Sequence, residues 1–302
     1  MTHISNPTSH ISNLSLGFSP CPNDTFIFDA LIHHKVDTQG FTFDVEYHDV
    51  ETLNQKAFRG ELDITKLSYH AFAYAQDKYE LLDAGSALGF GVGPLLIAKD
   101  GVLVKRLRSL LANKEPLAEQ DTKLRVGIPG KYTTANFLLG LAFPQLQNKV
   151  ELVFSDIENA LLEGRIDVGL IIHENRFTYQ EKGLLKVIDL GDFWEQRTGY
   201  PIPLGGIVVK RSLDERIKQQ INNLVRESVE YAFANPKSGL EYIRSHAQEM
   251  EESVMYKHIE LYVNRYSVNL GEEGRSAIQY MFAQAQEQEL IPESNQRIFL
   301  TE

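Results

Sequence analysis

The sequence repeats one local pattern in two series: a short apolar segment, a turn, and then a helix with an apolar face. In the first series, the apolar segment Leu14–Phe18 runs into the turn "SPCPND", and residues 63–76 ("DITKLSYHAFAYAQ") repeat the pattern. In the second series, "LRVGIP" is followed by "GKYT" and then "TANFLLGLAF". Strands that alternate with helices in this way form largely parallel sheets that are covered by helices. The pattern therefore predicts an α/β fold with two similar lobes.

Two connecting segments divide the chain between the lobes. The Gly-rich run at 85–100 leads out of the first lobe, and Pro201 and Pro203 flank the return. We expect a polar tail over residues 1–13, a discontinuous lobe 1 over 14–99 and 204–302 that includes the C-terminal helices, and lobe 2 over 100–203. Two α/β lobes joined by crossings have the shape of a type 2 periplasmic-binding-protein fold, which holds its ligand between the lobes.

Charge and cysteine content exclude several classes of function. The net charge of −11 and the lack of a long Lys/Arg cluster argue against nucleic-acid binding. A single cysteine, Cys21, allows no internal disulfide and no cysteine cluster for zinc or iron–sulfur binding. No apolar run is long enough to span a membrane and no secretory signal is visible, so we expect a cytoplasmic protein that does not act at a membrane. The sequence leaves homo-oligomerisation open.

Polar residues at two turns of the first series are candidates for anion binding. The start of the helix after "SPCP" can bind an anion through its amides, with help from Ser19, Asn23 and Thr25. The competing interpretation is a helix capped by Asn23 or Asp24. Ser68 lies at a strand-to-helix turn, where its hydroxyl can donate to a carboxylate or only cap the helix.

The turn of the second series gives a stronger indication of the same kind. In "PGKYTTANF", Gly130 permits a tight turn, and Thr133 and Thr134 place hydroxyls beside the first amides of a helix. The segment lacks the Gly and Lys spacing of a nucleotide-binding loop, so ATP is not implied. We expect a small ligand bearing a carboxylate and no cofactor.

His173 is the candidate general base. It ends the apolar run "RIDVGLII", which reads as a strand buried in a parallel sheet, and ligands bind at the carboxyl edge of such sheets. An imidazole there is suited to proton transfer, although a structural histidine is the competing interpretation. Glu174 either orients His173 or is a surface charge. No other histidine lies at metal-ligand spacing, so metal catalysis is disfavoured, and Cys21 is assigned to packing.

Several separated blocks resemble one enzyme family over nearly the whole chain from Leu14. The chain is similar to the 1,4-dihydroxy-6-naphthoate synthases, menaquinone-biosynthesis enzymes of the futalosine route. The blocks that carry the resemblance are "LGFSPCPNDTFIFDAL", "DVETLN", "TKLSYHAFAYA", "ALGFGVGPL", "TTANFLL", "GLIIHENRFTY", "DLGDFWEQRTGYPIPLGG" and "YVNRYSVNLGEEG".

The resemblance implies a carbon–carbon lyase that converts cyclic dehypoxanthine futalosine to 1,4-dihydroxy-6-naphthoate and releases a three-carbon fragment, dihydroxyacetone. By motif, it implies His173 as the proton acceptor. It also implies substrate-binding positions at Lys66, Leu67 and Ser68 and at the pair Thr134 and Ala135. Two alternatives stay open: a chorismate dehydratase of the same pathway, and a cytosolic carboxylate-binding protein without turnover.

Overall fold

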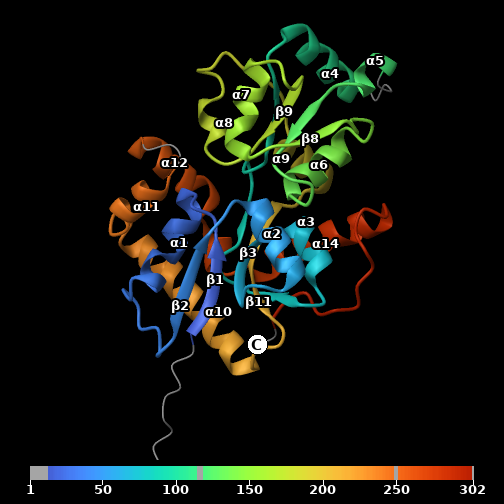
Figure 1. Ribbon diagram of the computed structural model, residues 1–302. Coiled ribbons are helices and arrows are strands. Elements are labelled where there is room, and N and C mark those ends of the chain that lie inside the picture. Colours follow the sequence, from blue (N-terminus) through green and yellow to red (C-terminus); the bar gives the residue numbers. More distant parts are fainter. Residues whose placement is uncertain (1–12, 114–117, 248–250, 301–302) are drawn as a thin grey trace, which may run out of the picture.

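The protein folds into two α/β lobes, each built on its own sheet (Figure 1). The structure is a computed structural model, and it describes residues 13–113, 118–247 and 251–300. Of the polar tail expected over 1–13, only Asn13 lies within the described residues, and it begins a strand. Across these described ranges, no helix is long and apolar enough to cross a membrane.

Lobe 1 is built on a six-stranded sheet with the order β2-β1-β3-β11-β4, in which β5 also pairs with β11. Strands β1 and β2 pair in parallel, as do β1 and β3, whereas β11 is antiparallel to its neighbours. The strands are β1 Asn13–Phe18, β2 Thr42–Tyr47, β3 Ile64–Ser68, β4 Tyr79–Leu81, β5 Ala87–Gly89 and β11 Ile202–Lys210.

Lobe 2 repeats this arrangement in a five-stranded sheet of order β10-β6-β9-β7-β8. Its parallel strands β8, β7 and β9 correspond in order to β2, β1 and β3, and β6 lies antiparallel beside β9, as β11 does beside β3. The strands are β6 Leu95–Ala98, β7 Val126–Ile128, β8 Lys149–Glu151, β9 Val168–Ile171 and β10 Leu185–Asp189. The two similar lobes expected from the sequence are therefore present.

The two sheets differ from the sequence expectations in two details. Strand β9 is buried, as "RIDVGLII" indicated, but it pairs in parallel only with β7 and is antiparallel to β6, so the sheet is mixed. The expected division placed residues up to 99 in lobe 1, whereas β6 belongs to the second sheet. An apolar run indicates a buried strand but does not reveal which sheet it joins, because that depends on distant partners.

Helices surround both sheets, and the C-terminal helices lie around lobe 1 (Figure 1). In lobe 1 they are α1 Pro22–Ile32, α2 Val50–Arg59, α3 Tyr69–Ala75, α10 Glu215–Ala234, α11 Leu240–His246, α12 Glu252–Tyr262, α13 Arg265–Val268 and α14 Gly271–Glu287. In lobe 2 they are α4 Gly101–Asn113, α5 Glu119–Thr122, α6 Thr134–Ala142, the 3₁₀ turn Phe154–Asp156, α7 Ile157–Leu162, α8 Asn175–Thr178 and α9 Leu190–Thr198.

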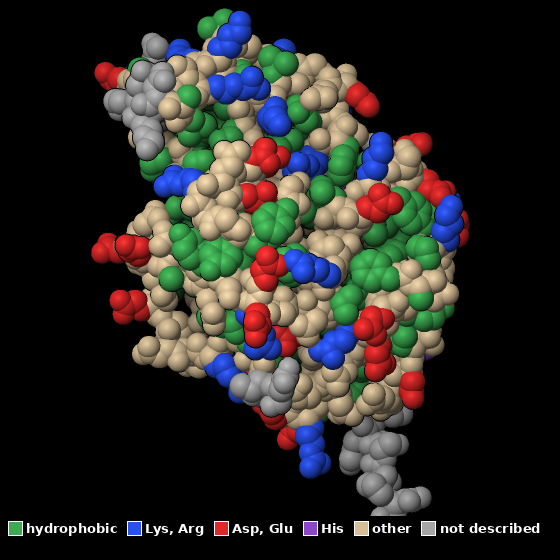
Figure 2. All heavy atoms as spheres, turned by 180° about the vertical axis from the view of Figure 1, so that it is seen from behind, with side chains coloured by type: hydrophobic (Ala, Val, Ile, Leu, Met, Phe, Trp, Pro, Cys, Tyr) green, Lys and Arg blue, Asp and Glu red, His purple; other side chains and the backbone are tan. Residues whose placement is uncertain are grey.

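The lobes share one continuous apolar core. Buried side chains of lobe 1, such as Phe72, and of lobe 2, such as Phe137, belong to the same cluster. Helices α3 and α6 contact each other where the lobes meet. On the face seen in Figure 2, acidic and basic side chains are interspersed, so the negative net charge is not gathered into one area there. The apolar contact between lobes fixes the shape of the space that they enclose.

Candidate functional site

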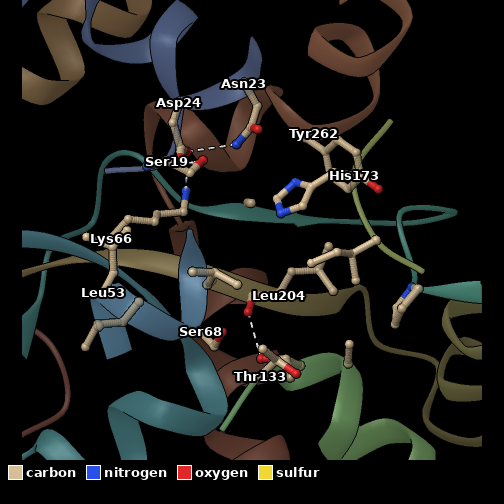
Figure 3. Close-up of a pocket in the computed structure, with 18 of the residues that line it drawn as sticks. Ser19, Asn23, Asp24, Leu53, Lys66, Ser68, Thr133, His173, Leu204 and Tyr262 are labelled. Atoms are coloured by element: carbon tan, nitrogen blue, oxygen red, sulfur yellow. Dashed lines mark hydrogen bonds and ion pairs between the residues drawn. The ribbon is translucent and has the colours of Figure 1, made fainter. Parts of the chain in front are cut away.

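A cavity lies between the lobes, where the carboxyl ends of β1, β3 and β9 come together (Figure 3). Its walls combine apolar side chains with a small number of polar groups, as is usual for small-molecule sites. The lining residues are Ser19, Asn23, Asp24, Val50, Leu53, Lys66, Leu67, Ser68, Ala87, Val92, Pro94, Thr133, Thr134, Ala135, Ile172, His173, Leu204, Gly205 and Tyr262.

His173 follows the end of β9 and points into this cavity (Figure 3). Its φ of 58° lies in the left-handed region, which a residue other than glycine adopts only when the surroundings require it. The ring lies against Phe154, with centroids 4.9 Å apart, and stacks on His258 at 5.9 Å. Burial lowers the pKa of His173 to about 4, so the imidazole is neutral at pH 7 and able to accept a proton.

The start of α1 carries a buried negative charge on one side of the cavity. The Asp24 carboxylate accepts hydrogen bonds from the Ser19 hydroxyl at 2.7 Å and from Nδ2 of Asn23 at 2.8 Å. It also lies 3.1 Å from Nζ of Lys66, which donates to the carbonyl of Gly85. Lys66 is therefore a buried ion-pair partner rather than a solvated charge. The carboxylate of Asp24 would repel an anionic ligand at this helix end.

Helix α1 begins two or three residues earlier than the sequence suggested. Its N-cap is Cys21 and Pro22 is its first residue, so neither Asn23 nor Asp24 is the cap. Proline suits the first helical position because its missing N–H would have no helical acceptor there. The Thr25 hydroxyl donates to the carbonyl of Cys21 at 3.0 Å, and Thr25 does not line the cavity.

Ser68 lies on the other side of the cavity, at the turn from β3 to α3 (Figure 3). Asn54 holds this turn by accepting from the Ser68 amide at 3.1 Å and donating to its hydroxyl oxygen at 3.5 Å. The side chain of Ser68 makes no cap bond, so its hydroxyl proton is available to a ligand.

The start of α6 faces the cavity from lobe 2. Thr133 is its N-cap, accepting from the amide of Asn136 at 3.2 Å and donating to the carbonyl of Gly130 at 2.8 Å. Gly130 has a φ of 150°, and a Cβ there would lie 2.5 Å from Oε2 of Glu51 in lobe 1, so the turn needs glycine. The first turn contains no acidic residue. The amides of Thr134 and Ala135 thus remain for an anion, since the first amides of a helix lack helical acceptors.

The Thr134 hydroxyl joins the two lobes. It donates to the carbonyl of Leu204 on β11 at 2.7 Å and accepts from the amide of His70 on α3 at 3.3 Å. Both hydroxyls of the threonine pair therefore have protein partners, and the amides of this segment, rather than its hydroxyls, are the groups that can contact a ligand.

The fold brings most of the predicted site residues around one cavity. Those that line it are Ser19, Asn23, Lys66, Leu67, Ser68, Thr133, Thr134, Ala135 and His173, and Thr25 is the exception. The first three differ from expectation in that they hold Asp24 or are held by it.

Sequence reasoning missed three residues at this site: Asp24 as a buried ion partner, and His258 and Tyr262 on α12. His258 is fully buried, and its Nε2 lies 2.8 Å from Oδ1 of Asn23. Its Nδ1 lies 3.6 Å from Oε2 of Glu174, which is itself buried and not a surface charge. The i, i+4 spacing of His258 and Tyr262 indicated a shared helix face, but nothing in the sequence placed that face beside residue 173.

Comparisons with known proteins agree on one family. A family model described as "Menaquinone biosynthesis" matches residues 14–287. A protein of Thermus thermophilus named 1,4-dihydroxy-6-naphthoate synthase is 44% identical over 95% of this chain and 99% of its own length. A protein of the same name from Streptomyces coelicolor is 39% identical over 92% of this chain and 95% of its own length.

Solved structures agree with the fold. A crystal structure of an Archaeoglobus fulgidus protein is 34% identical, with a TM-score of 0.82, and covers 93% of this chain and 100% of that one. The periplasmic aliphatic sulphonate-binding protein of Escherichia coli is 13% identical, with a TM-score of 0.63, over 95% of this chain and 92% of its own. The second likeness concerns the fold alone, and it confirms the expected periplasmic-binding-protein architecture.

Proposed function

Because this chain belongs to the menaquinone-biosynthesis family, we propose that it is a 1,4-dihydroxy-6-naphthoate synthase. In this role it is a carbon–carbon lyase that converts cyclic dehypoxanthine futalosine to 1,4-dihydroxy-6-naphthoate and releases dihydroxyacetone. The observation that carries the proposal is the neutral His173 in a cavity that also offers an uncompensated helix start and a hydroxyl donor.

The substrate carboxylate is bound at the side of the cavity formed by Ser68 and the start of α6. Ser68 supplies a hydroxyl proton, and Thr134 and Ala135 supply amides at the positive end of a helix dipole. The opposite side is unsuitable because Asp24 would repel a second carboxylate. This arrangement allows a protein with a net charge of −11 to bind an anion. The amides contact the carboxylate directly, whereas the net charge is spread over the whole surface.

His173 accepts a proton from the substrate during carbon–carbon cleavage. The neutral imidazole of His173 lines the cavity and has a lone pair that can accept a substrate proton. Removal of a hydroxyl or carbon proton makes the electron pair available for cleavage, and formation of the aromatic ring favours the products. A bound substrate pre-positioned against this base needs no further reactant.

Asp24 and Lys66 form the polar wall opposite the carboxylate site. Their ion pair is almost completely buried, with side-chain exposures of 2% and 8%. Lys66 lines the cavity, and its ammonium has a third N–H beside those directed at Asp24 and Gly85. This N–H can donate to a substrate oxygen, which agrees with the substrate-binding role implied for Lys66, Leu67 and Ser68. The proposed partner is a small carboxylate-bearing substrate, and a cytoplasmic location and the oligomeric state stay predictions to be measured.

The test is direct conversion by the purified full-length chain. Incubation with cyclic dehypoxanthine futalosine should produce 1,4-dihydroxy-6-naphthoate and dihydroxyacetone in equal amounts, measured by mass and absorbance. Activity should survive dialysis against a chelator, because no cofactor is expected. Consumption of chorismate with unchanged futalosine derivative would move the assignment to the dehydratase, and tight retention of the ligand without product would indicate a binding protein.

A further inference from the structure

Three side chains with metal-binding atoms, one of them His173, lie close together at the boundary between the lobes. The thiol of Cys21, a ring nitrogen of His173 and a carboxylate oxygen of Glu174 all lie within 4.8 Å of one another. Cys21 belongs to lobe 1, at the start of α1, and the other two residues belong to lobe 2, after β9. We propose that Cys21, His173 and Glu174 form an inhibitory site for a thiophilic divalent cation such as Zn²⁺, which would join the two lobes.

The donor set matches the preference of zinc. Thiolate, imidazole and carboxylate are the three side-chain ligands that Zn²⁺ takes, with bonds of about 2.0–2.3 Å and tetrahedral geometry. Such bonds set neighbouring ligand atoms about 3.5 Å apart, so side-chain rotation within the observed spacing is enough to reach them. Three protein ligands leave a fourth position, as is usual for zinc sites that are open to another group.

A fourth residue points to the same place independently. Nδ1 of His258 lies 3.6 Å from Oε2 of Glu174 and has no hydrogen-bond partner among the described residues. His258 is completely buried, and its other ring nitrogen is held by Asn23 at 2.8 Å. An unpaired buried nitrogen costs free energy, which a metal bound beside Glu174 would recover. His258, on α12, therefore lies beside Glu174, outside the group of three donors, and could take the open fourth position after a shift of its side chain.

Binding at this site would stop the proposed reaction in two ways. The metal would take the lone pair of His173, which could no longer accept a proton. It would also hold the ring of His173 in a fixed position between Cys21 of lobe 1 and Glu174 of lobe 2. Burial raises the pKa of the Cys21 thiol well above its ordinary value, so metal binding must displace the thiol proton to solvent.

The sequence disfavoured a catalytic metal, and the metal proposed here is inhibitory, so the two statements are compatible. Residue spacing along the chain gave no metal motif because the ligands come from three distant segments, at 21, at 173–174 and at 258. The binding itself does not depend on the proposed function, whereas the inhibition rests on His173 being the base.

The test uses Co²⁺ as a spectroscopic probe on the full chain, without substrate. Wild-type protein freed of metal by a chelator should bind one Co²⁺ per chain, with a thiolate-to-cobalt charge-transfer band in the near ultraviolet, and Zn²⁺ should displace it. Cys21→Ser should abolish the band and weaken Zn²⁺ affinity by more than about 100-fold, since loss of an outer-shell partner alone costs about 10–100-fold. Cys21→Ala is the second variant if the serine form does not fold.

His33→Gln is the matched control, because the side chain of His33 is 45% exposed, pairs with Asp29 at 2.9 Å and lies outside the cluster. It should leave both the band and the Zn²⁺ affinity unchanged. Zn²⁺ should also raise the melting temperature of the wild type but not of Cys21→Ser, since only the former links the lobes. Absence of the band, or a band that persists without Cys21, would overturn the proposal.

Turnover assays separate this proposal from the proposed function. Zn²⁺ should inhibit the wild type at concentrations that leave Cys21→Ser active. Cys21-dependent binding with undiminished turnover would overturn the inhibitory role. Failure to convert cyclic dehypoxanthine futalosine without any metal would overturn the proposed function and leave the spectroscopic result standing.

Discussion

The amino ends of α1 and α6 face the same cavity from opposite lobes, and only α1 has an acidic residue in its first turn. The first turn of α1 contains the buried carboxylate of Asp24, which is held by Ser19, Asn23 and Lys66. The first turn of α6 contains no acid, and its cap Thr133 bonds only to backbone of its own turn. Both ends follow a parallel strand of their own sheet, so the two lobes place equivalent helix starts at the cavity and use them differently.

The difference between the two helix ends predicts how the substrate is oriented in the cavity. A helix start attracts anions through its dipole and its unpaired amides, but at α1 the carboxylate of Asp24 would repel a second anion. The first turn of α6 contains no acidic residue, so we propose that the substrate carboxylate binds there and that the uncharged end of the substrate lies toward Asp24. His173 lies on the α1 side of the cavity, near Asn23 and Tyr262 and across from Thr133 (Figure 3).

The largest expected effect concerns His173, which lies across the cavity from the start of α6. His173→Asn should lower kcat by about 10²–10⁴-fold, the usual contribution of a positioned base. KM should change much less, because the carboxylate is bound at α6 and not at residue 173. Steady-state kinetics and the melting temperature should be measured on one preparation, since a destabilised variant with full turnover per folded molecule would make His173 a structural residue.

The pH dependence of the wild type provides the control for that variant. The pKa of His173 is lowered to about 4, so kcat/KM should be flat near neutrality and fall as the pH drops through about 4, where the protonated ring cannot accept a proton. A decline of kcat/KM centred near pH 6.5 would contradict the desolvated environment described for this ring.

The second prediction removes the acidic residue that distinguishes the start of α1 from the start of α6. Asp24→Asn leaves the ammonium of Lys66 buried without its counter-charge, and breaking a buried pair costs about 3–5 kcal/mol of unfolding free energy. Denaturant unfolding measures this change. Asp77→Asn is the matched control, because the pair of Asp77 and Lys78 is exposed and should contribute only about 0–1 kcal/mol. Equal effects of the two substitutions would remove the distinction between the α1 end and an ordinary surface charge.

The third prediction sharpens the assignment of the carboxylate to the α6 side. Ser68→Ala removes the hydroxyl proton that the substrate carboxylate would accept, and a hydrogen bond to a charged group contributes about 1.5–3 kcal/mol. KM should therefore rise by about 10–150-fold with little change in melting temperature. Binding of the naphthoate product, measured by calorimetry, should weaken to a similar extent, and unchanged affinity would exclude Ser68 from the anion site.

The smallest effect distinguishes a cap from a ligand. Thr133→Ala removes the hydroxyl that bonds the amide of Asn136 and the carbonyl of Gly130. We expect the free energy of unfolding to fall by about 1 kcal/mol, the usual cost of removing an N-cap. KM should change less than it does in the Ser68→Ala variant. A larger rise in KM for Thr133→Ala than for Ser68→Ala would reverse these assignments.

Much of the fold and of the site could be predicted from local pattern. The strands that begin at Asn13 and at Ile64, the helices that follow them and the corresponding units of lobe 2 all follow from apolar periodicity and turn chemistry. The family resemblance, confirmed by the matches over residues 14–287, depended on blocks of the same kind. The assignment of β6 to the second sheet could not be predicted, because strand partners are set by distant segments.

The sequence by itself determined the two-lobed α/β architecture and a histidine at the end of a buried strand, because both depend on residues that are close along the chain. Only the tertiary structure decided how the polar groups are paired: Asp24 with Lys66, Thr134 with Leu204, and His258 beside Glu174. These partners lie between 42 and 84 residues apart in sequence. Burial makes each pairing obligatory, since an unpaired polar group in a dry interior costs free energy, but it does not specify the partner until the lobes are packed together.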